Sequence, residues 1–286
     1  MDAQEADQIL RDVSADSALS TLGYAVVDLL DRPAVERLVD HWHSLARTHP
    51  PVWDPTGMAA TIRHPGLDRI AHGAILEEVA GPVDDLTVDR TCFMSTFLAK
   101  KPSSDELPAH LDWRLVDESS ELTHGCWIAL QDMEPRVGAL GVVPGSHLRV
   151  DFDRTPERPG HEWTDALLRD GAHREVLPIR AGQAIVFDHR LAHFSEPNAS
   201  EGVRLAANLG LSRPESAEEA CARLLAYMER GMKGIGSDPQ IPELLETRPA
   251  TEPPTSAAPS GAGRGQRPWR RVRDRLRGRG EPSWGS

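Results

Sequence analysis

Apolar residues recur at helical spacing in the first part of the chain. Asp31 stands where an N-cap is needed, and Pro33 occupies the first turn, where a missing N–H costs nothing. The helix that follows has one apolar face, formed at steps of three or four residues by Val35, Leu38, Trp42 and Leu45. A short helix is also expected over residues 3–13, and another over residues 67–80, ending before the Gly-Pro pair that follows.

Short runs of β type dominate the rest of the chain and are bounded by Gly, Pro and Asn turns. These runs cover residues 23–30, 91–99, 124–130, 140–143, 176–179, 184–187 and 203–211. Many short strands after an α-rich start predict an antiparallel sandwich or barrel flanked by helices. Residues 148–171 are expected to form an excursion between strands, and residues 215–230 a closing helix.

Charge and composition divide the chain near residue 238. The net charge is −12, but residues 264–286 carry eight arginines against two acidic residues, so this segment carries +6 and the first 263 residues carry −18. We therefore expect one folded domain over residues 1–238, whose acidic surface does not bind nucleic acid. Residues 239–286, rich in Pro, Gly and Arg, are expected to be a disordered tail. A short basic helix over residues 269–277 is possible within it, and its partner remains undefined.

The cysteines and the N-terminus exclude several classes of protein. Cys92, Cys126 and Cys221 are widely spaced and form no Cys-x-x-Cys pair, which argues against a zinc site or a disulfide framework. The first residues are acidic and lack the apolar stretch of a signal peptide. No run approaches the roughly 18 apolar residues that a membrane span requires. We therefore expect a soluble cytoplasmic protein without a membrane span.

His110 and Asp112 are the first candidates for metal chemistry. They lie two residues apart, so on extended backbone their side chains point the same way, about 7 Å apart. One imidazole and one carboxylate supply two of the three ligands in the 2-His-1-carboxylate set of non-haem Fe(II) oxygenases. Taken alone, the pair is equally consistent with a solvated loop.

A second cluster lies in residues 187–204. His193 and Ser195 share a face if the backbone is extended, and a turn then returns the chain so that Arg204 lies beside Ser195. Arg204 falls on the inward face of the following strand, where a buried guanidinium needs an anionic partner. A dicarboxylic acid held by Arg204 and Ser195 satisfies it, and so does an ordinary salt bridge to an internal acid.

Three segments follow one another in a fixed order. Their residues are Phe97-Leu-Ala-Lys-Lys-Pro102 leading to His110-Leu-Asp112; Trp127 to Asp132 followed by Gly138 to His147; and Asp188 to Arg204, with eleven residues from His193 to Arg204. Together they resemble the phytanoyl-CoA dioxygenase family of Fe(II)/2-oxoglutarate oxygenases. The resemblance covers roughly residues 19–213. It implies a double-stranded β-helix core (jelly-roll, cupin-like) flanked by N-terminal helices.

The resemblance also implies a cofactor set and a division of roles. The implied Fe(II) ligands are His110, Asp112 and His193. The far carboxylate of the cosubstrate 2-oxoglutarate would be held by Arg204 with help from Ser195, and Trp127 would lie close to the cosubstrate. With O2, the family converts 2-oxoglutarate to succinate and CO2 while oxidising a substrate. Related halogenases have a small residue at the carboxylate position, so the aspartate favours hydroxylation, desaturation or epoxidation.

Two other histidines compete for the third ligand position. His147 belongs to a Pro-Gly-Ser-His turn that is structural in the family. His189 precedes His193 by four residues, and if residues 191–193 are extended the two are too far apart to share a metal comfortably. His124 and His161 remain possible lining residues.

The substrate is the least constrained part of the sequence. The expected contacts are Trp113, Arg114 and Trp163, with Arg154 as a further candidate in the 148–171 excursion. The expected substrate is a small molecule, either an intermediate of specialised metabolism or an amino-acid derivative. Two other kinds of protein stay open: a metal-binding cupin in which Arg204 is structural, and an interaction protein that acts through the Arg-rich tail.

Overall fold

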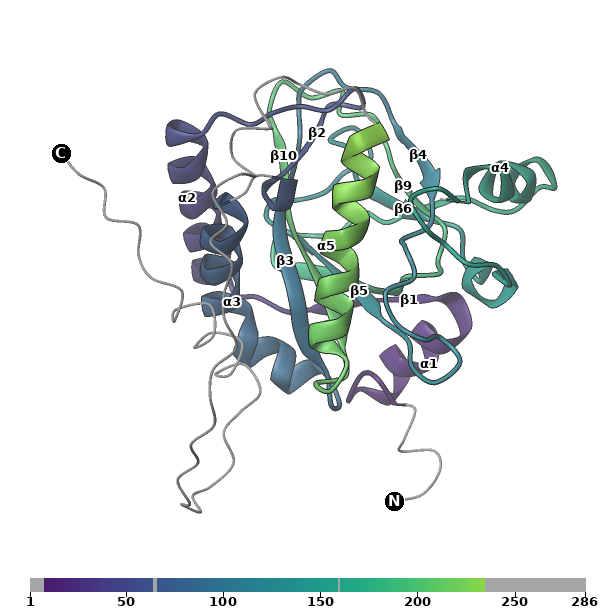
Figure 1. Ribbon diagram of the computed structural model, residues 1–286. Helices are drawn as coiled ribbons and strands as arrows, with labels where there is room; N and C mark the ends of the chain where they lie inside the picture. Colours follow the sequence, from purple (N-terminus) through teal and green to yellow (C-terminus); the bar gives the residue numbers. More distant parts are fainter. Residues whose placement is uncertain (1–7, 64–65, 159, 235–286) are drawn as a thin grey trace, which may run out of the picture.

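The computed structural model describes residues 8–63, 66–158 and 160–234 and contains two antiparallel sheets (Figure 1). The large sheet consists, in spatial order, of β1 (Tyr24–Asp28), β8 (Gln183–Asp188), β5 (His124–Ala129), β10 (Arg204–Ser212), β3 (Thr91–Lys100) and β2 (Met58–Ala60). The small sheet consists of β4 (Leu107–His110), β9 (His193–Ser195), β6 (Leu140–Val142) and β7 (Glu175–Val176). This is the predicted arrangement of many short antiparallel strands after a helical start.

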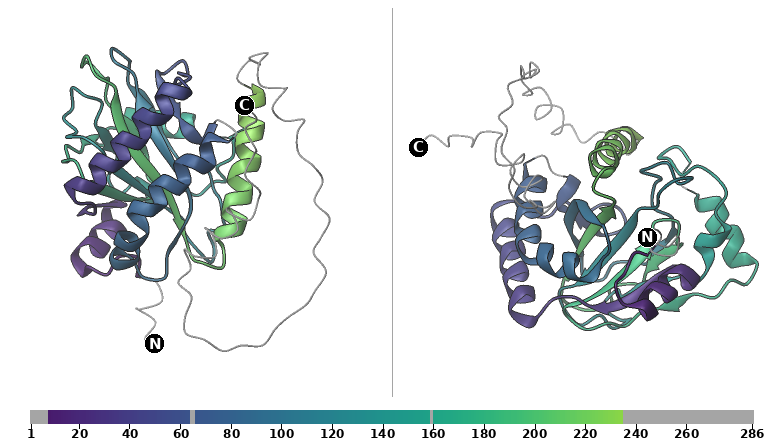
Figure 2. Two further views of the ribbon diagram at one scale, coloured as in Figure 1. Left: turned by 90° about the vertical axis from the view of Figure 1, so that its left-hand side faces the viewer. Right: turned by 90° about the horizontal axis from the view of Figure 1, so that it is seen from below.

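Helices cover the outside of the sheets. They are α1 (Val13–Leu22), α2 (Arg32–Thr48), α3 (Leu67–Leu86), α4 (His161–Arg169) and α5 (Ala217–Gly234), with 3-10 turns η1 (Thr61–Arg63) and η2 (Ser146–Arg149). Figure 2 shows α2 and α3 lying across one face of the large sheet. Helix α5 packs on β3, and α4 contacts β4 of the small sheet. The two sheets are therefore supported by helices at separate places.

Side-chain alternation in β10 separates two hydrophobic cores. Leu205, Ala207, Leu209 and Leu211 belong to the core between the large sheet and the helices. Ala206 belongs to the second core, between the sheets, together with Trp127 of β5 and Phe187 of β8. Because alternate residues of a strand point to opposite faces, Arg204 and Asn208 share the inner face with Ala206. Two polar side chains thus enter the space between the sheets from β10.

The predicted N-terminal helix over residues 3–13 is wrong for its described part. Residues 8–12 are not helical, and Leu10 pairs with Thr87 beyond the end of α3. The first helix instead begins at Val13, because the Asp12 carboxylate accepts a hydrogen bond from the Ala15 N–H. Sequence periodicity did not reveal this cap, since Asp12 was placed inside the helix.

Helix α3 continues through Gly81 and Pro82 to Leu86, beyond the predicted end at residue 80. A proline inside a helix costs about 3 kcal/mol or more through its lost hydrogen bond and its ring clash. Burial of a valine side chain stabilises by about 1.5–3 kcal/mol, and Val83 is fully buried in the core. Thr87 then ends the helix, with its N–H and its hydroxyl both bonded to the Val83 carbonyl.

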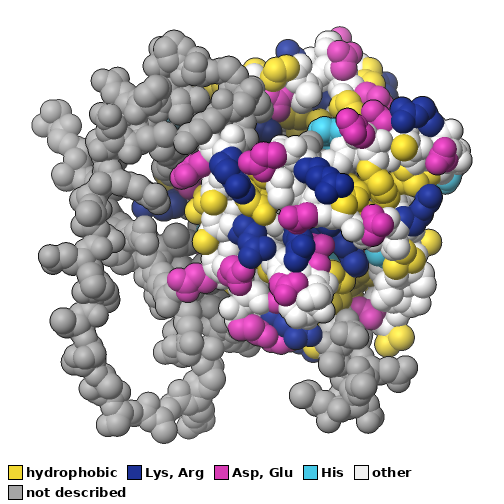
Figure 3. Space-filling model, turned by 45° about the vertical axis from the view of Figure 1, so that its right-hand side comes forward, with side chains coloured by type: hydrophobic (Ala, Val, Ile, Leu, Met, Phe, Trp, Pro, Cys, Tyr) yellow, Lys and Arg dark blue, Asp and Glu magenta, His cyan; other side chains and the backbone are white. Residues whose placement is uncertain are grey.

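Acidic and basic side chains are interspersed over the molecular face in Figure 3. Among the described helices, none is both long enough and apolar enough to cross a membrane. The tail expected over residues 239–286, including the basic helix at 269–277, lies outside the described residues.

Candidate metal and anion site

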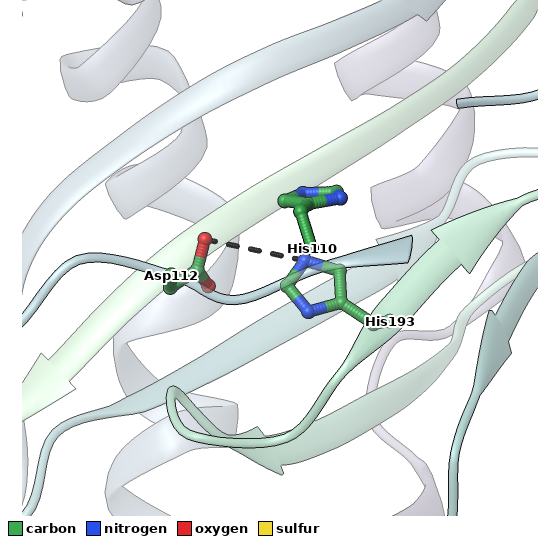
Figure 4. A group of neighbouring side chains, drawn as sticks. All are labelled: His110, Asp112 and His193. Carbon is green, nitrogen blue, oxygen red and sulfur yellow. Dashed lines mark ion pairs between the residues drawn. The ribbon is translucent and has the colours of Figure 1, made fainter. Parts of the chain in front are cut away.

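Two neighbouring strands bring His110, Asp112 and His193 together. His110 is the last residue of β4 and His193 the first of β9, and the two are paired in register across the small sheet. Their ring centroids lie 4.3 Å apart, and Asp112 Oδ1 lies 4.0 Å from His193 Nε2. One ligand atom from each residue falls within 4.8 Å of the others. Figure 4 shows the three side chains directed toward one another.

Backbone hydrogen bonds orient both imidazoles. His110 Nδ1 lies 2.9 Å from the Pro108 carbonyl, and His193 Nδ1 lies 3.0 Å from the Leu191 carbonyl. A carbonyl can only accept, so each Nδ1 carries the proton and donates it. The Nε2 lone pair of each ring is therefore free to bind a metal, which is the usual arrangement of metal-binding histidines.

The charges at the site favour the protonation state that binds metals. Desolvation by itself raises the pKa of Asp112, but the nearby histidines and Arg154 outweigh it and hold that pKa below its ordinary value. Burial and the neighbouring His193 lower the pKa of His110 to about 4. At neutral pH the pair consists of an ionised carboxylate and a neutral imidazole, as metal coordination requires.

His189, the competing candidate for the third ligand, lies next to the Asp112 carboxylate. Its Nδ1 is 2.8 Å from Thr123 Oγ1, and its Nε2 is 3.8 Å from Asp112 Oδ2. The backbone carbonyl of His189 also accepts a hydrogen bond from the Asp112 N–H at 3.2 Å. The three-residue group of ligand atoms does not include His189. His189 thus borders the carboxylate instead of replacing His193.

Arg154 ties the excursion between strands to the ligand-bearing segment. Its side chain is buried, its Nε donates to the Asp112 carbonyl at 2.8 Å, and its two terminal nitrogens donate to both oxygens of Glu118. The Arg154 carbonyl accepts in turn from the Arg114 N–H at 2.9 Å. Arg154, a candidate for substrate binding in the sequence, therefore has its hydrogen bonds committed to the protein.

Arg154→Met is expected to destabilise the fold by about 3 kcal/mol, because it leaves the largely buried Glu118 without its partner. Urea denaturation measures this change. The matched control is Arg32→Met, which breaks the Arg32–Glu36 pair, where the arginine side chain is 89% exposed. The control is expected to cost less than about 1 kcal/mol. Equal losses in the two variants would contradict the role assigned to Arg154.

The three predicted substrate contacts all have partners within the protein. Trp113 packs edge-on against Tyr227 of α5 with ring centroids 5.8 Å apart. Arg114 pairs with Asp117 and Asp153 and donates to the Val116 carbonyl. Trp163 of α4 packs on Phe152, with ring centroids 5.8 Å apart. Each of these side chains thus contacts other side chains of the protein, and their contact with a substrate stays a prediction.

Arg204 enters the space between the sheets as the first residue of β10. It is 2% exposed, and its guanidinium lies 5.3 Å from the centre of the Trp127 ring. Its Nη2 contacts Met58 Sδ at 3.4 Å, and its Nε has no hydrogen-bond partner. Burial lowers its pKa to about 10. No carboxylate within residues 8–63, 66–158 and 160–234 pairs with it, so the salt-bridge alternative from the sequence is not realised there.

Lys100 is a buried residue of this site that sequence reasoning missed. It lies directly across from Arg204 in the β10–β3 pair and is fully buried. Its Nζ donates to Ser195 Oγ at 2.9 Å and to the Glu196 carbonyl at 2.6 Å. Burial and the charge of Arg204 lower its pKa to about 8. Lys100 is the last residue of β3, and its pairing with Arg204 places it on the inner face, whereas Lys101 follows the strand and is exposed.

Strand β9 connects the buried cations to the metal-type cluster. Ser195, which Lys100 contacts, lies two residues after His193 on β9. Two adjacent buried cations, neither paired with a carboxylate in the described part of the chain, form a site that favours an anion. An anionic ligand that also reached the cluster would be recognised at both of its ends.

Comparison with known proteins agrees with this geometry. The sequence profile described as phytanoyl-CoA dioxygenase (PhyH) matches residues 30–206. The chain is 27% identical over 111 residues to phytanoyl-CoA dioxygenase domain-containing protein 1 homolog of Dictyostelium discoideum, covering 36% of this chain and 40% of that protein. It spans about half or less of the length of the two curated relatives it matches.

Two solved structures share the fold. One is SnoK, a non-heme alpha ketoglutarate dependent carbocyclase from nogalamycin biosynthesis, with a TM-score of 0.55, 21% identity, and coverage of 71% of this chain and 84% of SnoK. The other is HygX from Streptomyces hygroscopicus with nickel, 2-oxoglutarate and hygromycin B bound, with a TM-score of 0.50, 18% identity, and coverage of 70% and 86%. The jelly-roll fold is thereby confirmed, and the profile match over more than half of the sequence shows that the chain belongs to the phytanoyl-CoA dioxygenase family.

Proposed function

We propose that this protein is an Fe(II)- and 2-oxoglutarate-dependent dioxygenase that hydroxylates a C–H bond of a small molecule. The observation that carries the proposal is the position of His193, a member of the cluster with His110 and Asp112, two residues before Ser195 on β9; Ser195 contacts the buried Lys100, which lies opposite the buried Arg204. A metal centre and an anion site joined in this way fit a cosubstrate that is both a chelator and a dicarboxylate.

The donor set fits iron. Two neutral imidazoles and one carboxylate are the facial ligand set of non-haem Fe(II) oxygenases, and they leave positions open for other ligands. The Nδ1 hydrogen bonds to Pro108 and Leu191 fix the rings with Nε2 toward the cluster. When bound, the iron would supply the activation of dioxygen, with 2-oxoglutarate consumed to give succinate and CO2. The protein would supply orientation of the reactants and exclusion of water.

The buried cations fit the far carboxylate of 2-oxoglutarate. Arg204 presents guanidinium donors that have no acceptor other than Met58 Sδ among the described residues, and a carboxylate matches their planar geometry. Trp127 lies against the guanidinium and limits its movement. Apolar side chains from both sheets surround this space, which strengthens charge pairing inside it.

The fold neighbours support a small-molecule substrate. HygX is described with hygromycin B bound and SnoK as a carbocyclase from nogalamycin biosynthesis, so both descriptions associate this fold with small organic molecules. SnoK is itself a carbocyclase by description, which makes ring formation a second candidate outcome at the same site, beside rearrangement. Desaturation and epoxidation use the same metal ligands, so they are candidate outcomes as well. Mass analysis of the product distinguishes a gain of oxygen from a loss of hydrogen or an isomerisation.

Anaerobic addition of Fe(II) and 2-oxoglutarate is expected to give the metal-to-ligand charge-transfer absorption band of a chelated keto acid. Glutarate, which has the same two carboxylates but no keto group, is the control and is expected to give no band. Admission of O2 should then produce succinate. Well-folded protein that gives neither the band nor succinate would rule out the proposed function.

A further inference from the structure

Lys100 uses all of its donors inside the protein. Its ammonium group has three N–H bonds, and three acceptors lie around it: Ser195 Oγ at 2.9 Å, the Ser195 carbonyl at 3.4 Å and the Glu196 carbonyl at 2.6 Å. No donor therefore remains for a ligand. Lys100 can still affect a ligand through Ser195, because a hydroxyl that accepts a hydrogen bond from Lys100 can donate its own proton to another group.

The Lys100 contact determines the direction of the Ser195 hydroxyl proton. An ammonium group can only donate, so Ser195 Oγ is the acceptor in this bond and its own proton points elsewhere. Ser195 is 3% exposed, and its hydroxyl proton has no acceptor in the described part of the chain. A buried donor without an acceptor is costly, and a carboxylate between Ser195 and Arg204 would satisfy it. If Lys100 were neutral, one of its positions would become an acceptor and the Ser195 proton could turn back toward it.

The charges around Lys100 come from three directions. Arg204 faces it from β10, Asp105 and Glu106 follow β3, and Glu196 follows β9. Glu106 and Glu196 both pair with Arg174, at 3.0 and 3.7 Å. None of these carboxylates forms an ion pair with Lys100 among the described residues, so its charge is balanced only by carbonyl and hydroxyl dipoles.

We propose that Lys100 is a positioning residue for 2-oxoglutarate: its ammonium group turns the Ser195 hydroxyl toward the far carboxylate, so that the cosubstrate binds more tightly when Lys100 is protonated. This inference rests on the proposed function and adds a proton-linked step to it. It concerns Lys100 and Ser195, whereas metal binding depends on other residues.

The sign of the pH dependence follows from the charges. Burial and Arg204 lower the pKa of Lys100 to about 8 in the ligand-free protein, so above pH 8 most molecules hold a neutral lysine. A bound carboxylate favours the charged form and raises this pKa. Binding of 2-oxoglutarate therefore takes up a proton above pH 8. The affinity for 2-oxoglutarate is highest below pH 7 and falls as the pH rises. Both carboxyl groups of 2-oxoglutarate titrate far below this range.

Isothermal titration calorimetry of the Mn(II)-loaded protein with 2-oxoglutarate tests the inference without turnover. The dissociation constant is expected to rise roughly tenfold between pH 7 and pH 9.5, with uptake of roughly 0.7 proton at pH 8.5 measured in buffers of different ionisation enthalpy. Lys100→Met should bind roughly tenfold more weakly at pH 7 and take up no proton. Lys100→Arg, which keeps its charge, should also show no proton uptake.

Lys101→Met is the matched control. Lys101 is exposed, and its loss changes the net charge by the same amount, so its pH profile should follow that of the unaltered protein. A flat profile in the unaltered protein, or a linkage that persists in Lys100→Met, would overturn the inference while leaving the proposed function intact. Failure of every form to bind 2-oxoglutarate would instead overturn the proposed function.

Discussion

His193→Ala is expected to abolish iron-dependent conversion of 2-oxoglutarate to succinate, with a loss of at least roughly 100-fold. The histidine is the first residue of β9, and its pairing with His110 places both rings at one point. Within the described part of the chain no other imidazole belongs to the cluster, and His189, which borders Asp112, is held by Thr123. Iron content after reconstitution and succinate formation measure the effect, and His110→Ala and Asp112→Ala should behave in the same way.

A histidine far from the cluster provides the control for this prediction. His43 is exposed on α2, and His43→Ala should leave iron content and succinate formation unchanged. Circular dichroism of each variant checks that the fold is intact, since His193 is buried. Retention of more than about a tenth of the succinate formation in His193→Ala would contradict the assigned ligand set.

Arg204→Met is expected to weaken 2-oxoglutarate binding at least roughly 30-fold while leaving metal affinity unchanged. Loss of a buried charge-assisted pair costs about 2–5 kcal/mol, which corresponds to a factor of this size or larger. Calorimetry with the Mn(II)-loaded protein measures cosubstrate affinity, and titration with the metal alone measures metal affinity. Arg180→Met, at a side chain that is 76% exposed, is the control and should change neither.

The same substitution is expected to leave the ligand-free fold at least as stable as before. Arg204 has an unpartnered Nε and no ion pair among the described residues, so methionine removes a desolvated charge and keeps much of the side-chain volume. Thermal unfolding without ligand measures this. Destabilisation together with unchanged cosubstrate affinity would favour the alternative in which the fold is a metal-binding cupin and Arg204 is structural.

Local signals predicted a large part of the fold. The helix Arg32–Thr48 follows from Asp31, Pro33 and an apolar stripe, because caps and periodicity act within a few residues of chain. The alternation of β10 placed Arg204 on the inward face for the same reason. Packing against distant segments of the chain decided the features that local signals did not predict correctly. Helix α3 passes through Pro82 because Val83 is buried against the core, and β2, which lies outside the predicted strands, forms because it pairs with β3.

The sequence by itself determined the family resemblance, the order of strands and helices, and the residues proposed to bind iron and 2-oxoglutarate. Only the tertiary structure decided how these residues are supported: His110 lies opposite His193 through the pairing of β4 with β9, and Lys100 lies opposite Arg204 through the pairing of β3 with β10. It also committed Arg154 to Glu118. The physical reason is that propensity and alternation are local, whereas strand register and the burial of charge depend on segments about a hundred residues apart.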